Sequence, residues 1–574
     1  DGGALHINNS GDSYSAMSKC PFIAKGCIFK NNSAGANAGV IMLYSTYQND
    51  KFDGCQFLNN TAGGDGGCIN IAGNSQVELL GNTFDGNSAG RNGGAINEDT
   101  WGKGSLNLSN DIFTNNTAKN RGGAVVTTRK ASITDNTFTG NTAGSGGAVD
   151  FNGKTGSFAS SGNTYKSNSS TFEGGAVSIG AADSTKFDNE YFENNSSVSG
   201  GAVAVTYKNT TITNSRFYNN SVAPDSNNMY GSGGAVYVRN ATNVTLAGNT
   251  YNGNTARWGG AVDIQGATSA TLTDEVMTSN RTSGGGGAIH NNGTSTKIVN
   301  GTYTDNYSPT SGGAICNSGI MTISYSSDGD TSGIFKNNTA GTDGGAISSY
   351  VQDIATPTVT LNGITFEGNS SKVGGAIYVQ KNTVLNSSNA TYKNNTATSE
   401  GGAICNKGIV SIDSGAVTGN TAPEGAAICQ NGTLELSKLA TIATDNDIYL
   451  HNNKFVTVPA ALSNNFVARI TPSDYTLGRT CVRDTYGAKG SALEPKFTLT
   501  PNGSYFLYGG DLISSANNAD VVISENYPVT YDCGTSPNPT GHFSDGTNLD
   551  DEDVKEWGVD YELRTDKPTA KGYL

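Results

Sequence analysis

The sequence predicts an all-β fold, a right-handed parallel β-helix, and three observations lead to this prediction. One phrase recurs along the chain: an aromatic residue, Asn three positions later, Thr or Ser, Ala, a short polar loop and Gly-Gly-Ala-aliphatic, as in residues 335–347. The phrase returns sixteen times between residues 2 and 428, at intervals of 24 to 36 residues, and such periods are typical of solenoids. Short stretches of alternating apolar residues indicate strands. Finally, many of the 77 glycines stand at the same place in each repeat, unlike those of a flexible linker.

We expect three short strands in each coil. The first follows Gly-Gly-Ala, because an apolar residue such as Ile71 or Val238 stands two positions after the aliphatic residue. The second comes seven to fifteen residues later, as in 244–246, and the aromatic residue lies on the third. Left-handed β-helices have shorter, hexapeptide-based turns, and the leucine-rich signature is missing. About 16 regular coils, stacked about 4.8 Å apart, predict a rod roughly 75 Å long.

The asparagine of the phrase predicts a ladder of side chains through the stack. Fifteen coils carry the aromatic-x-x-Asn element, with Met277 and Val417 replacing the aromatic residue in two of them. An asparagine in a turn can adopt left-handed backbone angles, and its amide can bond the coils above and below. The aromatic rings are expected to stack in the same way. The predicted ladder is Asn32, Asn60, Asn87, Asn116, Asn141, Asn168, Asn195, Asn220, Asn254, Asn280, Asn306, Asn338, Asn369, Asn395 and Asn420.

The composition changes near residue 440, and this change predicts three parts. Residues 1–439 form the regular coils. Residues 440–525 contain strand-like stretches without the Gly-Gly-Ala mark, such as 446–450 and 455–458, and we expect them to be atypical coils that cap the rod. Residues 526–574 are expected to form a separate small module. Since residue 1 lies directly on a repeat, we expect the chain to be cut from a longer precursor.

The cysteines follow the repeat, and two pairs of them are candidates for a disulfide. Cys27 and Cys55 each stand two residues before an aromatic residue, and Cys405 and Cys429 each follow the aliphatic residue of the glycine phrase. Equivalent residues on stacked coils lie about 4.8 Å apart, near the lower end of disulfide Cα distances. Cys27–Cys55 and Cys405–Cys429 are therefore candidate disulfides, with free thiols as the alternative.

One column of residues has the composition of a catalytic triad. Asp263, His290 and Cys316 occupy the position after Gly-Gly-Ala-aliphatic on three consecutive coils, which we expect to face outward. Together they are the residue types of a thiol nucleophile, its base and the base's orienter. The alternative is a set of unrelated polar residues on a flat, wet surface, since no signal for an oxyanion hole or pocket accompanies them. We favour that alternative.

The composition also bears on partners and cofactors. With 35 Lys plus Arg against 49 Asp plus Glu, the net charge is -14, which disfavours nucleic acid as a partner. No run of about 18 apolar residues is present to insert into a membrane. We expect no cofactor and no metal site, because the four histidines are scattered through the sequence: His6, His290, His451 and His542.

The recurring Gly-Gly-Ala-Ile and Phe-x-x-Asn motifs resemble those in the passenger domain of chlamydial polymorphic outer-membrane proteins and in related β-helical adhesins of gut bacteria. The resemblance covers residues 1 to about 430. Residues 527–532 through 565–574 are instead similar to a Listeria–Bacteroides-type repeat, a β-grasp-like module of Gram-positive surface proteins. Together these resemblances imply a secreted or cell-surface bacterial protein, anchored to the cell wall through other segments.

The leading functional hypothesis is a non-enzymatic adhesin or stalk, a rigid rod that presents a binding face to a host or microbial surface protein or glycan. Strict repetition without a convergent polar cluster motivates this hypothesis. Two alternatives remain open. Parallel β-helices also include polysaccharide lyases and hydrolases, so a carbohydrate-active enzyme is one. A self-assembling extracellular filament is the other, because the ends of a β-helix are unpaired sheet edges that can stack.

Overall fold

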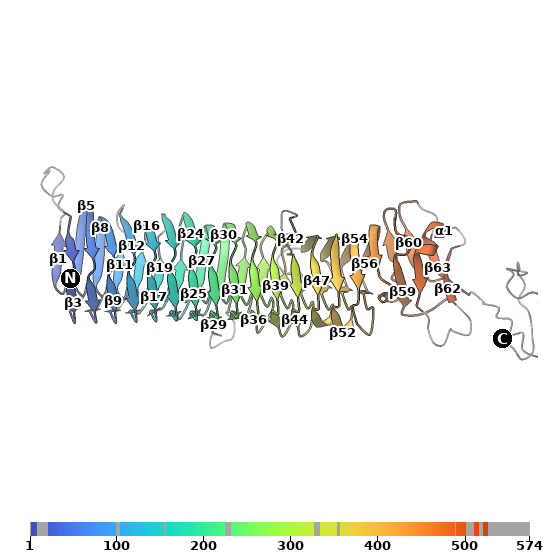
Figure 1. Cartoon of the computed structure of the whole chain (residues 1–574), viewed down its shortest axis with the longest axis horizontal. Helices are drawn as coiled ribbons and strands as arrows, with labels where there is room; N and C mark the ends of the chain where they lie inside the picture. Colours follow the sequence, from blue (N-terminus) through green and yellow to red (C-terminus); the bar gives the residue numbers. More distant parts are fainter. Residues whose placement is uncertain are drawn as a thin grey trace, which may run out of the picture.

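The computed structural model is a long parallel β-solenoid of about 17 turns, which confirms the predicted β-helix (Figure 1). It describes residues 2–8, 21–98, 104–153, 156–223, 231–326, 333–352, 356–487, 490–500, 510–515 and 520–525. The predicted β-grasp-like module at 526–574 lies outside these residues. Within them, no helix is long and apolar enough to cross a lipid bilayer.

A typical coil contains four strands, one more than the sequence predicts. In one coil these are β37 (Ile289–Asn292), β38 (Thr296–Val299), β39 (Thr302–Thr304) and β40 (Tyr307–Ser308). We call the strands equivalent to β37, β38 and β39 the first, second and third faces. The two-residue strand after the ladder asparagine forms a separate corner sheet, which runs from β4 (Ser33–Ala34) to β52 (Thr396–Glu400). In some coils the first two faces merge into one bent strand, as in β27 (Val203–Thr213) and β30 (Val236–Ala247).

Neighbouring coils pair in parallel with equivalent residues opposite each other. On the first face, β37 pairs with β33 (Val262–Gln265) on one side and β41 (Ile315–Asn317) on the other. The paired glycines allow this close stacking. Gly286 has a φ of 73°, and a Cβ on Gly287 would lie 2.0 Å from the Gly313 carbonyl oxygen of the next coil. A side chain at the second glycine would therefore push two coils apart.

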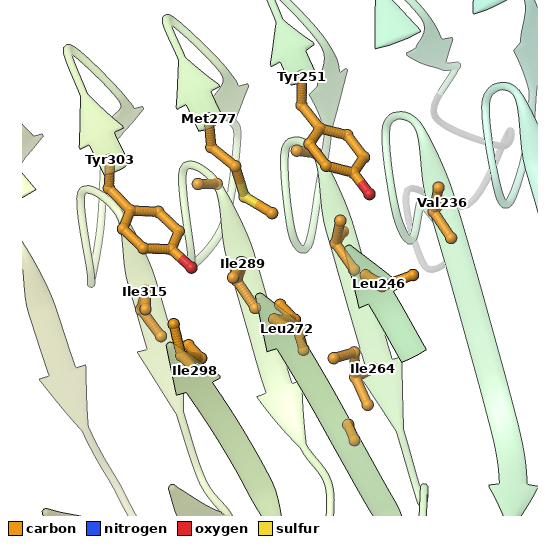
Figure 2. Packing of buried hydrophobic residues seen from close by; sticks show 14 of the residues in the cluster. Val236, Leu246, Tyr251, Ile264, Leu272, Met277, Ile289, Ile298, Tyr303 and Ile315 are labelled. Carbon is orange, nitrogen blue, oxygen red and sulfur yellow. The ribbon is translucent and has the colours of Figure 1, made fainter. Parts of the chain in front are cut away.

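The interior is a column of apolar side chains from the three faces. Figure 2 shows this packing, with Tyr251, Met277 and Tyr303 following one another along the third face. From Phe57 to Tyr251, rings on successive coils stack with centroids 4.6 to 4.9 Å apart. Met277 interrupts the column, which resumes at Tyr303 and Phe335 with a spacing of 4.6 Å.

The fifteen asparagines form a continuous hydrogen-bonded ladder. In Asn254, for example, the backbone N–H and Nδ2 both donate to Asn280 Oδ1, at 3.0 and 2.9 Å, and Nδ2 also donates to the Phe217 carbonyl oxygen. The ladder continues one step beyond the regular repeat, because Asn420 donates to Asn446 Oδ1. The left-handed backbone expected at the ladder position lies one residue earlier, for example at Ser279 (φ 56°).

A second ladder runs through the corner between the second and third faces, and the sequence analysis did not identify it. From Cys55 to Asn249, each backbone N–H at this position donates to the side chain of the next coil, as Asn82 does to Asp111 Oδ1 at 2.7 Å and Asn249 does to Glu275 Oε1 at 3.3 Å. The ladder ends at Glu275, because the next coil has Gly301 at this position. Three members are carboxyl groups, and all are buried: Asp111, Glu190 and Glu275. Burial raises their pKa values, to about 7 for Asp111 and about 8 for each glutamate.

Parallel coils continue after residue 439 through β57 (Asp447–Leu450), β58 (Val456–Val458), β59 (Ala468–Pro472), β60 (Thr480–Asp484) and β61 (Phe497–Leu499). A short helix, α1 (Gly490–Leu493), and a 3₁₀ turn, η1 (Glu494–Lys496), precede β61. The pairing then becomes antiparallel: β63 (Asp520–Glu525) pairs with β60 and with β62 (Gly510–Ser514). These strands lie at the red end of the rod in Figure 1.

The structure has free thiols at both candidate disulfides. Cys27, Cys55, Cys405 and Cys429 are all free, so the alternative of unpaired cysteines holds and neither candidate disulfide is formed. Cys405 and Cys429 do lie directly opposite each other, as predicted. However, side chains in register on parallel strands point the same way, so their Cβ atoms stay about 4.8 Å apart, beyond the 3.5–4.5 Å usual for a disulfide.

Candidate functional site

The structure brings the predicted column together on the first face. Asp263 on β33, His290 on β37 and Cys316 on β41 are direct neighbours in the register of the parallel strands. The periodicity of the repeat fixes this arrangement, since the three residues follow equivalent aliphatic positions. The column is continuous, with one residue on each coil.

The column is buried, which corrects the expectation of a wet outer surface. Asp263, His290 and Cys316 are 0%, 5% and 2% exposed. The Trp258 ring lies 5.1 Å from that of His290, and a Cβ on Gly285 would lie 2.9 Å from Cys316 Sγ and 3.0 Å from Trp258. The loops before the glycine pairs therefore fold back over the first face. The sequence does not reveal this cover, because these loops lack a common motif.

Hydrogen bonds join the column to residues on other coils. His290 Nδ1 lies 2.8 Å from Asp263 Oδ1, and His290 Nε2 lies 2.9 Å from the Tyr350 hydroxyl. Gln265 Nε2 donates to Asp263 Oδ2 at 2.9 Å, and the Tyr237 hydroxyl donates to Gln265 Oε1 at 3.1 Å. Both oxygens of the buried aspartate are thus engaged. The result is a polar network of aromatic, amide and acidic groups.

This network does not have the organisation of a thiol protease-like triad. The second ring nitrogen of His290 contacts Tyr350 and not Cys316, so the imidazole has no direct path to the sulfur. Burial, with the nearby Asp343 carboxyl adding to it, raises the pKa of Cys316 to about 12. The thiol is therefore protonated at neutral pH, whereas a nucleophilic cysteine needs a lowered pKa. The geometry favours a structural role for the column.

Other first-face residues in the same position are buried as well. Asp150 is fully buried and lies 3.3 Å from Arg121 Nη1; burial raises its pKa to about 6, against the lowering effect of the arginine. Tyr237, at the same position of its repeat, is only 6% exposed. Most of the polar groups on this face therefore serve the packing of the loops above them.

The structure also assembles a cluster that sequence reasoning missed. Glu400, Cys429 and His451 place one carboxylate, sulfur and ring nitrogen atom within 4.8 Å of one another. Cys405 lies beside them, with Sγ 3.6 Å from Glu400 Oε2. Cys429 lies 29 positions after Glu400, 24 after Cys405 and 22 before His451, each close to one coil. The repeat period therefore places Cys429 next to Cys405. His451 follows β57, outside the regular repeat, and carries no such signal.

Comparison with protein families supports the resemblance described above. Four segments match the Chlamydia polymorphic membrane protein repeat: residues 112–128, 332–350, 363–380 and 393–407. Each segment includes one ladder asparagine and the Gly-Gly-Ala phrase that follows it. The four asparagines are Asn116, Asn338, Asn369 and Asn395. The resemblance to the chlamydial passenger repeats is confirmed at these four places. Comparisons with curated proteins and with solved structures gave no match.

Proposed function

We propose that this chain is the non-enzymatic rod of a bacterial surface protein, an adhesin or stalk that presents a binding face at a distance from the cell. The four repeat matches and the solenoid fit a surface or secreted passenger segment. One observation carries the proposal furthest: the buried asparagine ladder and the Gly-Gly-Ala corner recur through the regular coils, whereas the exposed side chains differ from coil to coil. Such a frame holds its shape while its surface varies.

The outer surface offers groups for contact with a receptor. Phe172 and Tyr207 are large aromatic side chains on nearby coils, 66% and 50% exposed. Aromatic residues are enriched in binding hot spots, and they also stack on sugar rings. The proposed ligand is a host or microbial surface protein or glycan.

A surface-binding assay tests the adhesive function. We expect the folded chain, coated on a plate, to bind mucin, epithelial cells or a subset of arrayed glycans in a saturable way. The double variant Phe172→Ser, Tyr207→Ser should bind at least several-fold less. Ile28→Thr is the matched control, since Ile28 is as exposed as Phe172, at 66%, and lies near the N-terminal end of the rod. Circular dichroism establishes that each variant is folded. Absence of binding by the folded wild-type chain across all three ligand sets would reject the adhesive function.

A further inference from the structure

A group of four side chains lies at the junction between the regular and the closing coils. Glu400 ends β52, Cys405 lies on β53 (Ile404–Asn406), and Cys429 lies on β55 (Ile428–Gln430). His451 directly follows β57. Cys429 Sγ lies 3.2 Å from His451 Nε2 and 3.9 Å from Glu400 Oε2, and Cys405 Sγ lies 3.6 Å from the same carboxylate oxygen.

Three of the six separations among these ligand atoms can be compared with the edges of a tetrahedral metal site. Zinc binds sulfur at about 2.3 Å and nitrogen or oxygen at about 2.0–2.2 Å. Two ligand atoms at these distances and at the tetrahedral angle lie about 3.3–3.8 Å apart. For a sulfur and a nitrogen or oxygen the separation is about 3.6 Å. The two sulfur–oxygen separations are 3.6 and 3.9 Å and the sulfur–nitrogen separation is 3.2 Å, so each lies within about 0.4 Å of that value. Ligand atoms of Glu400, Cys429 and His451 all lie within 4.8 Å of one another, and Cys405 Sγ approaches this group through Glu400. The donor set, two thiolates with one imidazole and one carboxylate, is of the kind that zinc prefers.

The charges at this place balance around a divalent cation. Two thiolates and one carboxylate carry three negative charges. Lys407 supplies one positive charge, with Nζ 3.6 Å from Glu400 Oε2, and it also lies over the Tyr378 ring. A divalent ion completes neutrality. This matters because Cys405 and Cys429 are both 0% exposed, and an unbalanced charge in such a place is costly.

The backbone holds the histidine in position before any ion binds. The His451 N–H donates to the Gln430 carbonyl oxygen at 3.1 Å, and an Arg479 guanidinium nitrogen donates to the His451 carbonyl oxygen at 2.8 Å. Arg479 also donates to the carbonyl oxygen of Leu450 at 3.0 Å. These bonds fix the turn after β57, so the backbone of the histidine is already ordered when an ion arrives.

We propose that Cys405, Cys429, His451 and Glu400 bind one zinc ion, which ties the last regular coils to the closing coils. The ion replaces the thiol protons, and both protons are released to solvent. The site would stabilise the place where the repeat ends, since its ligands come from three successive coils. This role is independent of the proposed adhesive function.

Metal content and cobalt substitution test this proposal. The full chain is purified under reducing conditions, incubated with zinc and freed of excess ion. We expect about one zinc per chain by elemental mass spectrometry, and in cobalt-loaded protein the thiolate-to-cobalt charge-transfer absorption. Cys429→Ser and His451→Gln should each lower zinc affinity by tenfold or more. Cys316→Ser is the matched control, because Cys316 occupies the same position of the repeat beside a histidine and should leave the stoichiometry unchanged.

Thermal unfolding provides a second readout. A chelator should lower the melting temperature of the wild-type and Cys316→Ser proteins and should have no effect on Cys429→Ser. A folded, reduced wild-type chain that takes up neither zinc nor cobalt would overturn the proposal. So would a Cys405–Cys429 disulfide detected by peptide mass spectrometry in protein prepared with zinc present. Equal loss of zinc in the Cys316→Ser control would also overturn it, since binding would then not depend on this cluster.

Discussion

At the scale of single residues, the buried carboxyl groups of the second ladder have the clearest consequences. Asp111, Glu190 and Glu275 accept hydrogen bonds at positions where the other members of this ladder with a polar side chain are uncharged: Asn82, Asn136, Asn163, Ser215 and Asn249. Burial penalises their charged forms, and the side chains that donate to them are neutral amides: Asn82, Asn163 and Asn249. The folded chain therefore holds these groups protonated to higher pH than the unfolded chain does.

We expect the free energy of unfolding to fall as the pH rises from about 5 to about 8. In this window the unfolded chain has released protons that the folded chain keeps on Glu190 and Glu275, whose pKa values lie near 8. Each such group contributes a slope of up to about 1.4 kcal/mol per pH unit. Urea unfolding at several pH values measures the slope. Glu275→Gln should make it shallower and increase stability at pH 8; an unchanged slope in this variant would contradict the assignment.

At the scale of elements, the third-face strands owe much of their order to stacked rings and bonded amides. Both features repeat with the coil, so one substitution alters contacts on both neighbouring coils. The break at Met277 on β35 (Val276–Thr278) shows where the ring column is incomplete. Figure 2 shows its thioether between Tyr251 and Tyr303.

Completing the ring column should stabilise the rod. Met277→Phe places a ring between Tyr251 and Tyr303, where stacking adds about 0.5–1.5 kcal/mol beyond the burial of apolar area. A rise in the midpoint of urea unfolding measures the gain. The inverse variant, Phe84→Met, removes a ring that stacks at 4.6 and 4.8 Å with its neighbours and should lower the midpoint. If both variants shift the midpoint in the same direction, ring stacking is not the cause.

Removing one asparagine from the first ladder should be costly. Asn254→Ala deletes two side-chain bonds and also leaves the backbone N–H and Nδ2 of Asn220 without their acceptor, at a buried position. Each unpaired buried group costs about 1–3 kcal/mol, so we expect a loss of roughly 2–5 kcal/mol in the free energy of unfolding. Asn252→Ala is the control, since Asn252 is exposed on the same strand, β31 (Thr250–Asn252). A loss below about 1 kcal/mol would show that the ladder is dispensable.

At the scale of the whole molecule, stability is a sum over contacts between neighbouring coils. At about 4.8 Å per coil, 17 turns give a rod of roughly 80 Å, in which distant coils share no contacts. Damage in one place should therefore stay local. This behaviour differs from that of a globular core, where one cavity affects the entire fold.

Hydrogen exchange measures how far such damage spreads. In Asn254→Ala we expect amide protection to fall in β28 (Arg216–Tyr218), β31 and β35, and to stay at the wild-type level in β6 (Gln56–Leu58) and β9 (Thr83–Asp85). Mass spectrometry of peptides from each coil resolves the two regions. A uniform loss of protection from β6 to β35 would indicate a single cooperative unit instead.

The repeat carries enough information to predict the solenoid, the Asn ladder and the ring column, because a strict period places Asn254 and Asn280 on adjacent coils. Features without a fixed residue type were missed. The second ladder uses Asn, Asp, Glu and Ser interchangeably, since each supplies an acceptor oxygen, so no motif marks it. The burial of His290 depends on loops of varied sequence, and the approach of His451 to Cys429 depends on a turn outside the repeat.

The contact between Gly287 and the Gly313 carbonyl shows that each coil is shaped to accept a neighbour of its own kind. A whole coil can therefore be duplicated or deleted, and the two coils that then become neighbours still fit together. The reach of such a protein from the surface that carries it is then an evolvable quantity, adjustable in steps of one repeat. A partial repeat has no such freedom, because it would bring unlike corners together.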